Sequence, residues 1–184
     1  MAVVSPTCFS VGDEQVIIRT AQIEDAAALL DYIRGVAAET EFFILGPDEF
    51  PPEEEEVVWI QDHLDQPGKL LLMAEAGGQL IGNLSFENGR YQKMAHRGEL
   101  GISVCQPWRG RGIGTAMLRT FLNWAESHPT IAKVCLEALV TNERAIRLYK
   151  KLGFVEEGIR RKEVKQPSGQ YIDALHMALF VKPV

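Results

Sequence analysis

Hydrophobic and polar residues follow two different periods along this chain. Apolar residues spaced three or four positions apart predict helices over 23–36, 51–65, 116–126 and 142–152. Short runs rich in apolar or β-branched residues predict strands over 16–19, 70–75, 79–86, 99–104, 134–138, 154–165 and 171–181. About seven strands interspersed with about four helices are typical of a layered α/β protein.

Glycine and proline mark the expected turns between these elements. Gly77-Gly78 separates two strand runs and predicts a hairpin, and Pro167-Ser168-Gly169 predicts a second hairpin near the C-terminus. Gly153 directly follows the fourth helix, as is common at helix C-termini. Residues 1–15 mix small and polar types without a period, so we expect a loose lead-in. The chain 1–184 is long enough for one domain with one core.

The loop between the strand 99–104 and the third helix is the most distinctive stretch. It reads Arg109-Gly110-Arg111-Gly112-Ile113-Gly114-Thr115. A helix N-terminus carries unpaired backbone N–H groups and a partial positive charge, and glycines let an anion approach them closely. A tight turn with two solvated arginines is the plainer interpretation, but it needs fewer glycines. The pattern therefore predicts a phosphate site, while the spacing fits neither a Walker loop nor a dinucleotide fingerprint.

Two segments carry a resemblance to a known family. Arg109-x-x-Gly112-x-Gly114 resembles the (Q/R)xxGx(G/A) signature of the GNAT family of N-acetyltransferases, in which it holds the pyrophosphate of acetyl-CoA. Thr141–Phe154 resembles the second signature, N-x-x-A-x-x-x-Y-x-x-x-G-F, at every position. The resemblance extends from about Val16 to Phe180 and implies the GNAT fold, with a mixed central sheet.

The resemblance also implies roles for individual residues. Main-chain groups of Ile102, Ser103 and Val104 would pair with the pantetheine amides of acetyl-CoA as an added strand does. Asn142 is expected to cap the fourth helix and to contact the cofactor. Tyr149 would protonate the departing coenzyme A thiolate, although a core aromatic residue is the alternative.

An amine acceptor must lose a proton before it attacks a thioester. Glu99, at the start of the central strand, matches the place where some family members carry a glutamate base. The alternative is an exposed carboxylate paired with Arg97 or Lys93, and His96 is a weaker candidate base. A covalent acyl intermediate on Cys105 is disfavoured, because nothing nearby in the sequence activates that thiol.

Composition narrows the possible partners. A formal net charge of −6 argues against a general nucleic-acid-binding protein. The four glutamates 53–56 suit a solvated helix start better than a metal site, so we expect no metal. Three widely spaced cysteines, no apparent signal peptide and no long apolar run favour a cytoplasmic protein without a membrane span. We also expect Phe42 and Phe43 in the core, and Arg160-Arg161-Lys162 on a solvent-facing strand rather than at a 3′-phosphate.

Together these features predict an N-acetyltransferase that uses acetyl-CoA, without a covalent intermediate, on a primary amine of a small molecule. The run Gly169–Ala178 resembles the tail of family members acting on amino acids and related compounds, which makes an amino-acid-like acceptor the first hypothesis. The alternatives are an acetyltransferase for protein N-termini or ribosomal proteins, and a non-catalytic sensor of acyl-CoA. A homodimer is possible, because two-chain association is common in the family.

Overall fold

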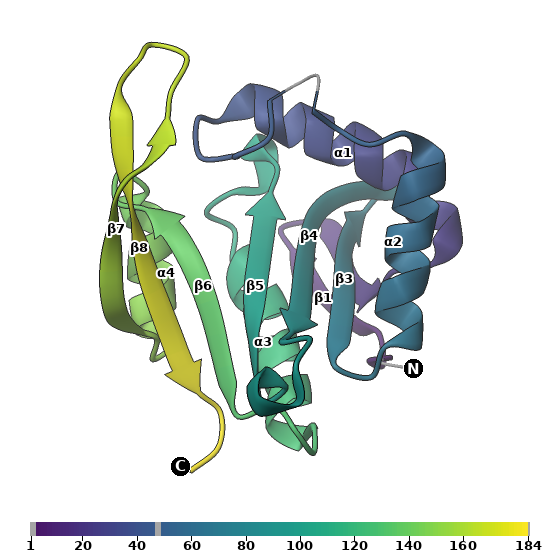
Figure 1. Ribbon diagram of the computed structural model, residues 1–184. Helices are drawn as coiled ribbons and strands as arrows, with labels where there is room; N and C mark the ends of the chain where they lie inside the picture. The colour runs from purple at the N-terminus through teal and green to yellow at the C-terminus, as the bar shows by residue number, and fades with distance from the viewer. Residues whose placement is uncertain (1–2, 47–48, 184) are drawn as a thin grey trace.

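The computed structural model describes residues 3–46 and 49–183 and contains one eight-stranded sheet with helices on both faces (Figure 1). The strands are β1 (Thr7–Val11), β2 (Glu14–Thr20), β3 (Lys69–Ala76), β4 (Gln79–Asn88), β5 (Arg97–Val104), β6 (Lys133–Leu139), β7 (Val155–Lys165) and β8 (Tyr171–Phe180). The helices are α1 (Ala26–Glu39), α2 (Glu53–Asp65), α3 (Ile113–Ser127) and α4 (Glu143–Lys151). The sheet order is β1-β2-β3-β4-β5-β6-β8-β7, so the predicted α/β architecture is confirmed.

The predicted secondary structure differs from the structure most clearly at two places. Residues 7–11, expected in a loose lead-in, form β1, which pairs with β2 in antiparallel register and adds one strand to the predicted seven. This edge strand is largely exposed, so its sequence lacks the apolar alternation of a half-buried strand. Helix α3 begins at Ile113 rather than Ala116, which places Ile113–Thr115 in its first turn.

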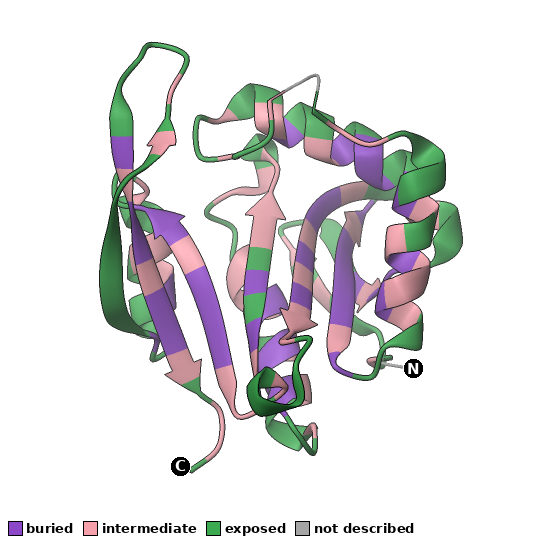
Figure 2. Ribbon diagram, viewed as in Figure 1, coloured by how far each residue is buried: buried purple, intermediate pink, exposed green. Residues whose placement is uncertain are grey.

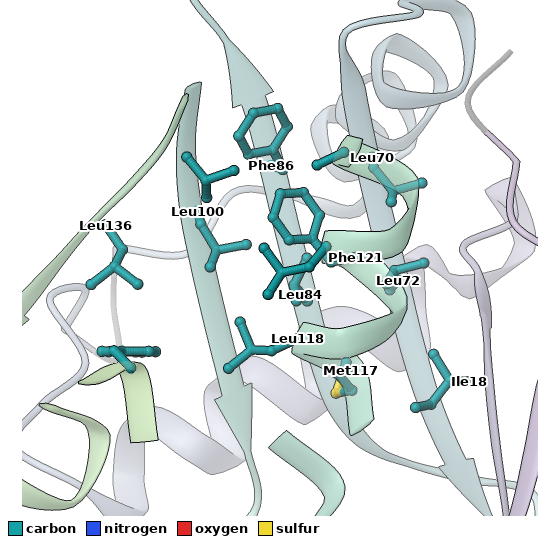
Figure 3. Packing of buried hydrophobic residues seen from close by; sticks show 14 of the residues in the cluster. Ile18, Leu70, Leu72, Leu84, Phe86, Leu100, Met117, Leu118, Phe121 and Leu136 are labelled. Carbon is teal, nitrogen blue, oxygen red and sulfur yellow. The ribbon is translucent and has the colours of Figure 1, made fainter. Parts of the chain in front are cut away.

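Two apolar layers hold the sheet. Residues of α1 and α2 pack with Leu71 and Met73 of β3 on one face, and residues of α3 and α4 pack with the larger cluster on the other. Figure 2 shows that buried residues are concentrated in the inner strands, such as β3 and β6. In the larger cluster, Phe86 and Phe121 stand with ring centroids 4.9 Å apart (Figure 3).

Truncation of Phe121 tests this packing. Phe121 is fully buried between α3 and the sheet, so Phe121→Ala should lower the free energy of unfolding by about 3–5 kcal/mol. Asn123→Ala on the exposed side of the same helix is the matched control and should change it by less than about 0.5 kcal/mol. Denaturant unfolding followed by circular dichroism measures both, and equal effects would contradict the assigned core.

The sheet opens at its centre. β5 and β6 are parallel, and their pairing covers only Arg97–Leu100 of β5 and Lys133–Leu136 of β6. Beyond Leu100 the two strands diverge, as Figure 1 shows, while Gly101–Val104 stays paired with β4 on its other side. The last four residues of β5 therefore keep one free edge, which faces the opening.

Candidate active site

The loop after β5 leads directly into the amino end of α3. Gly110 and Gly112 have φ values of +83° and +89°, a left-handed conformation that favours glycine, and Gly112 is the N-cap of α3. The N–H groups of the first turn have no acceptor within the helix, and they carry the positive end of the helix dipole. The loop therefore leads into a helix start whose first N–H groups are free of helical acceptors, and its role as a phosphate site stays a prediction.

A substitution at Gly112 tests that geometry. Gly112→Val forces a β-branched residue into the left-handed region at a cost of about 1–2 kcal/mol, or turns the amides away, and should weaken coenzyme A binding about tenfold. Gly12→Val is the matched control, because Gly12 has φ +63° and equally open space in the β1–β2 turn. Calorimetric titration with coenzyme A measures the dissociation constant of each variant. If Gly112→Val bound coenzyme A as tightly as Gly12→Val, the assigned site would be contradicted.

The two arginines of the loop differ in their contacts. The guanidinium of Arg109 is engaged with the protein: its Nε donates to the carbonyl of Val104 at 2.7 Å and its Nη2 to Glu39 at 2.9 Å. Arg111 is exposed and lies over the ring of Trp108, 5.3 Å from its centroid. Arg109 therefore orders the loop, and its expected contact with a cofactor stays a prediction.

Helix α4 supplies a third arginine that the sequence did not reveal. The Nη2 of Arg144 lies 3.3 Å from the position that a Cβ on Gly110 would occupy. Leu148, one turn later, lies against Gly114 of α3. The motif signalled only Asn142 and Tyr149, and the contact itself depends on how α4 docks.

Asn142 and Tyr149 occupy the positions expected from the helical spacing. Asn142 caps α4, because its Oδ1 accepts a hydrogen bond from the N–H of Ala145 at 3.2 Å. Tyr149 is 7% exposed and packs near Phe154, with ring centroids 5.9 Å apart. Burial raises the pKa of Tyr149 to about 12, so the phenol keeps its proton at neutral pH.

Glu99 lies at the closed end of the opening between β5 and β6. Its register partner on β6 is Cys135, within the last stretch where the strands are still paired. Because side chains alternate along a strand, Glu99 points to the sheet face opposite Leu100, the face covered by α1 and α2. The side chain is 55% exposed and forms an ion pair with Arg97, the pairing that the sequence offered as the alternative.

A second carboxylate, which the sequence analysis missed, borders the same opening. Glu137 is the first β6 residue beyond the β5–β6 pairing and points, like Glu99, away from the Leu136 side. Its side chain is 26% exposed, and His176 Nε2 on β8 lies 2.8 Å from its Oε2. Two carboxylates from neighbouring strands thus lie at the point where the sheet divides.

The remaining candidates fit catalysis less well. His96 is exposed and precedes β5, where its carbonyl accepts bonds from the N–H groups of Ala132 and Lys133. Burial raises the pKa of the Cys105 thiol, with Glu39 adding to the effect, so the reactive thiolate is disfavoured. These observations support attack without a covalent cysteine intermediate.

Two segments that are far apart in the sequence, the one after α1 and the tip of the β7–β8 hairpin, contact each other. The tip of the β7–β8 hairpin reaches the segment after α1, where Gln166 Nε2 donates to the carbonyl of Glu41 at 3.2 Å (Figure 1). Phe43 packs against the α1–α2 layer, as expected, whereas Phe42 is exposed and was wrongly assigned to the core.

The basic run of β7 has the location that the sequence predicted. Arg160, Arg161 and Lys162 are all exposed. Arg160 pairs with Glu137, and Arg161 pairs with Asp173 on β8. The prediction of a charged, solvent-facing strand is confirmed.

The parallel strands β5 and β6 separate in front of the glycine-rich start of α3. This arrangement is that of an acyltransferase of the GNAT type, as the resemblance implied. A family model described as the acetyltransferase (GNAT) family matches residues 35–154, and the chain therefore belongs to this family. Enzymes of the family use acetyl-CoA as co-substrate.

Individual relatives extend the match over most of the chain. An L-amino acid N-acetyltransferase, AaaT, of Escherichia coli (strain K12) is 29% identical over 164 residues, covering 89% of this chain and 97% of the relative. An N-alpha-acetyltransferase of Sulfurisphaera tokodaii is 30% identical over 141 residues, covering 72% of this chain and 80% of the relative. The crystal structure of a GNAT-family acetyltransferase from Streptococcus pneumoniae has a TM-score of 0.87 at 26% identity, covering 90% of this chain and 99% of that one.

Three further observations concern the described residues alone. Within 3–46 and 49–183, no group of three or more His, Cys, Asp or Glu side chains has the arrangement of a metal site. No helix in those ranges is long and apolar enough to cross a membrane. Cys8 is an exposed free thiol, Cys105 is half-buried and Cys135 is buried.

Proposed function

We propose that this protein transfers the acetyl group of acetyl-CoA to the amino group of a small, amino-acid-like molecule. The single observation that carries the proposal is the free edge of β5, Gly101–Val104, which runs directly into the amino end of α3. The backbone N–H and C=O groups of such an edge bind an extended partner as a further strand would. Pantetheine, with two amides in an extended chain, suits this edge.

The cofactor would lie along the opening with its pyrophosphate at the helix start. Ile102, Ser103 and Val104 supply main-chain groups to the pantetheine arm, and Ile113–Thr115 supply amides to the phosphates. Arg111 is exposed at the same loop and adds a positive charge. This order directs the thioester toward the closed end of the opening, where Glu99 and Glu137 lie.

The chemistry follows from the groups at that end. Glu99 takes a proton from the acceptor ammonium, and the free amine attacks the thioester carbon. A backbone N–H of β5 stabilises the oxyanion of the tetrahedral intermediate. When the carbon–sulfur bond breaks, Tyr149 donates its proton to the thiolate, leaving an amide and coenzyme A. Solvent reprotonates Tyr149 and accepts the proton held by Glu99.

The acceptor class is argued from the walls of the site. We call the sheet face that carries Glu99 and Glu137 the acceptor face. The contact between Gln166 and Glu41 closes one side of this face, which favours a compact acceptor over an extended polypeptide. The similarity to AaaT of Escherichia coli, over nearly that protein's full length, supports the same choice. A protein N-terminus is the second candidate, supported by the similarity to the archaeal N-alpha-acetyltransferase.

Two measurements test the proposal. Calorimetry should show binding of coenzyme A and of acetyl-CoA to the purified protein. A thiol-release assay should then show faster turnover with free amino acids than with short peptides bearing a free N-terminus. Absence of heat with both nucleotides would overturn the assignment, binding without turnover of any amine would favour a sensor, and preference for peptides would overturn the acceptor class.

A further inference from the structure

Helix α1 supports the part of β5 that has lost its β6 neighbour. The hydroxyl of Tyr32, in the middle of α1, lies 2.9 Å from Ser103 Oγ, and Ser103 Oγ donates to Asn83 Oδ1 on β4 at 2.6 Å. Tyr32 is 8% exposed, so this contact lies inside the layer between α1 and the sheet. The free segment of β5 is thus held from the acceptor side as well as by β4.

The last residue of α1 makes a second connection, to the turn after β5. One oxygen of Glu39, Oε2, accepts from the backbone N–H of Gln106 at 2.7 Å and from Arg109 Nη2 at 2.9 Å. Arg109 in turn donates from Nε to the carbonyl of Val104, the last residue of β5. Glu39 and Arg109 are each 26% exposed. These bonds link α1 to the end of β5 and to the loop Arg109–Thr115, which we call the phosphate loop.

We propose that Glu39 is a positioning residue that holds the phosphate loop in its cofactor-binding geometry. Hydrogen bonds to an ionised carboxylate are stronger than those between neutral groups, so one carboxylate oxygen fixes both the turn and the arginine. The N–H groups at the start of α3 must converge on one anion, and a site built on a loop needs such support to be precise. Glu39 touches no reacting atom.

A second physical effect of Glu39 has the opposite sign, which makes the inference testable. Its negative charge lies beside an anion site, so Coulomb repulsion alone predicts tighter coenzyme A binding once the charge is removed. Solvent and salt screen that repulsion at a partly exposed site, whereas loss of the Arg109 bond loosens the loop itself. The positioning effect therefore dominates, and removal of the charge weakens binding.

The decisive variant is Glu39→Gln, which keeps the shape of the side chain and one acceptor. The dissociation constant for coenzyme A, measured by calorimetry, should rise about tenfold, as expected when a hydrogen bond to a charged group is lost. The KM for acetyl-CoA should rise similarly while kcat stays within about twofold. Asp31→Asn removes an exposed charge from the same helix and should change neither value.

A double-mutant cycle separates positioning from independent effects. Arg109→Gln alone should also weaken coenzyme A binding about tenfold, and the double variant should be no more than about twentyfold weaker rather than a hundredfold. Coenzyme A should also slow amide hydrogen exchange over the last turn of α1 in the wild type and not in Glu39→Gln. A merely structural role for Glu39 would not produce that difference.

The outcomes distinguish this inference from the proposed function on which it rests. If wild-type protein binds coenzyme A and Glu39→Gln binds it equally or more tightly, the positioning role is overturned and the proposed function stands. Multiplicative losses in the cycle would overturn the role as well. If the wild type itself gives no heat with coenzyme A, the proposed function fails and this inference fails with it.

Discussion

Tyr149→Phe should bind acetyl-CoA as the wild type does and lose about a hundredfold or more in kcat, the range that a general acid contributes. The variant keeps the ring that packs near Phe154 and removes only the hydroxyl, so we expect it to fold as the wild type does. Only the step in which the thiolate departs loses its proton donor. Steady-state kinetics with a thiol-release assay, beside calorimetry with acetyl-CoA, separates the two parameters.

The pH dependence adds a second test of the same residue. Because burial raises the pKa of Tyr149 to about 12, the phenol should remain protonated through pH 10 and cause no loss of kcat on the alkaline side below about pH 11. Tyr91→Phe, at a tyrosine that is 70% exposed, is the matched control and should leave turnover unchanged. Unchanged turnover in Tyr149→Phe would exclude it as the acid and leave solvent in that role.

The predictable part of the site is the part encoded locally. Glycine is the residue that readily takes the left-handed conformation found at positions 110 and 112, so the loop could be identified from residue types alone. The spacing from Asn142 to Tyr149 is two helical turns, and the structure confirms one as the cap and the other as buried. Both inferences needed only local geometry.

The unpredicted part depends on contacts between distant segments. Glu39 lies 67 residues from Gln106 and 70 residues from Arg109, and no periodicity joins them. Glu137 belongs to a strand whose existence was predicted, but its place at the opening follows from where β5 and β6 cease to pair. β1 was missed because an exposed edge strand has little apolar pattern to detect.

The identity of the general base gives the other large expected effect. Glu99→Gln should lower kcat/KM about a hundredfold, because a glutamine cannot take the proton of the ammonium. Glu137→Gln should raise the KM for the amine about tenfold and leave kcat nearly unchanged, because one charge facing the ammonium is lost. In each variant one carboxylate oxygen of the wild type is replaced by an amide nitrogen, so each variant serves as the control for the other.

The opposite pattern would reassign the roles. Glu137 already has His176 at 2.8 Å from its Oε2 and Arg160 at 3.3 Å from the same oxygen. These two neighbours occupy the same carboxylate oxygen of Glu137 and favour a binding role for it, whereas Glu99 has Arg97 as its one ion-pair partner within the described residues. A hundredfold loss of kcat/KM in Glu137→Gln, and not in Glu99→Gln, would make Glu137 the base.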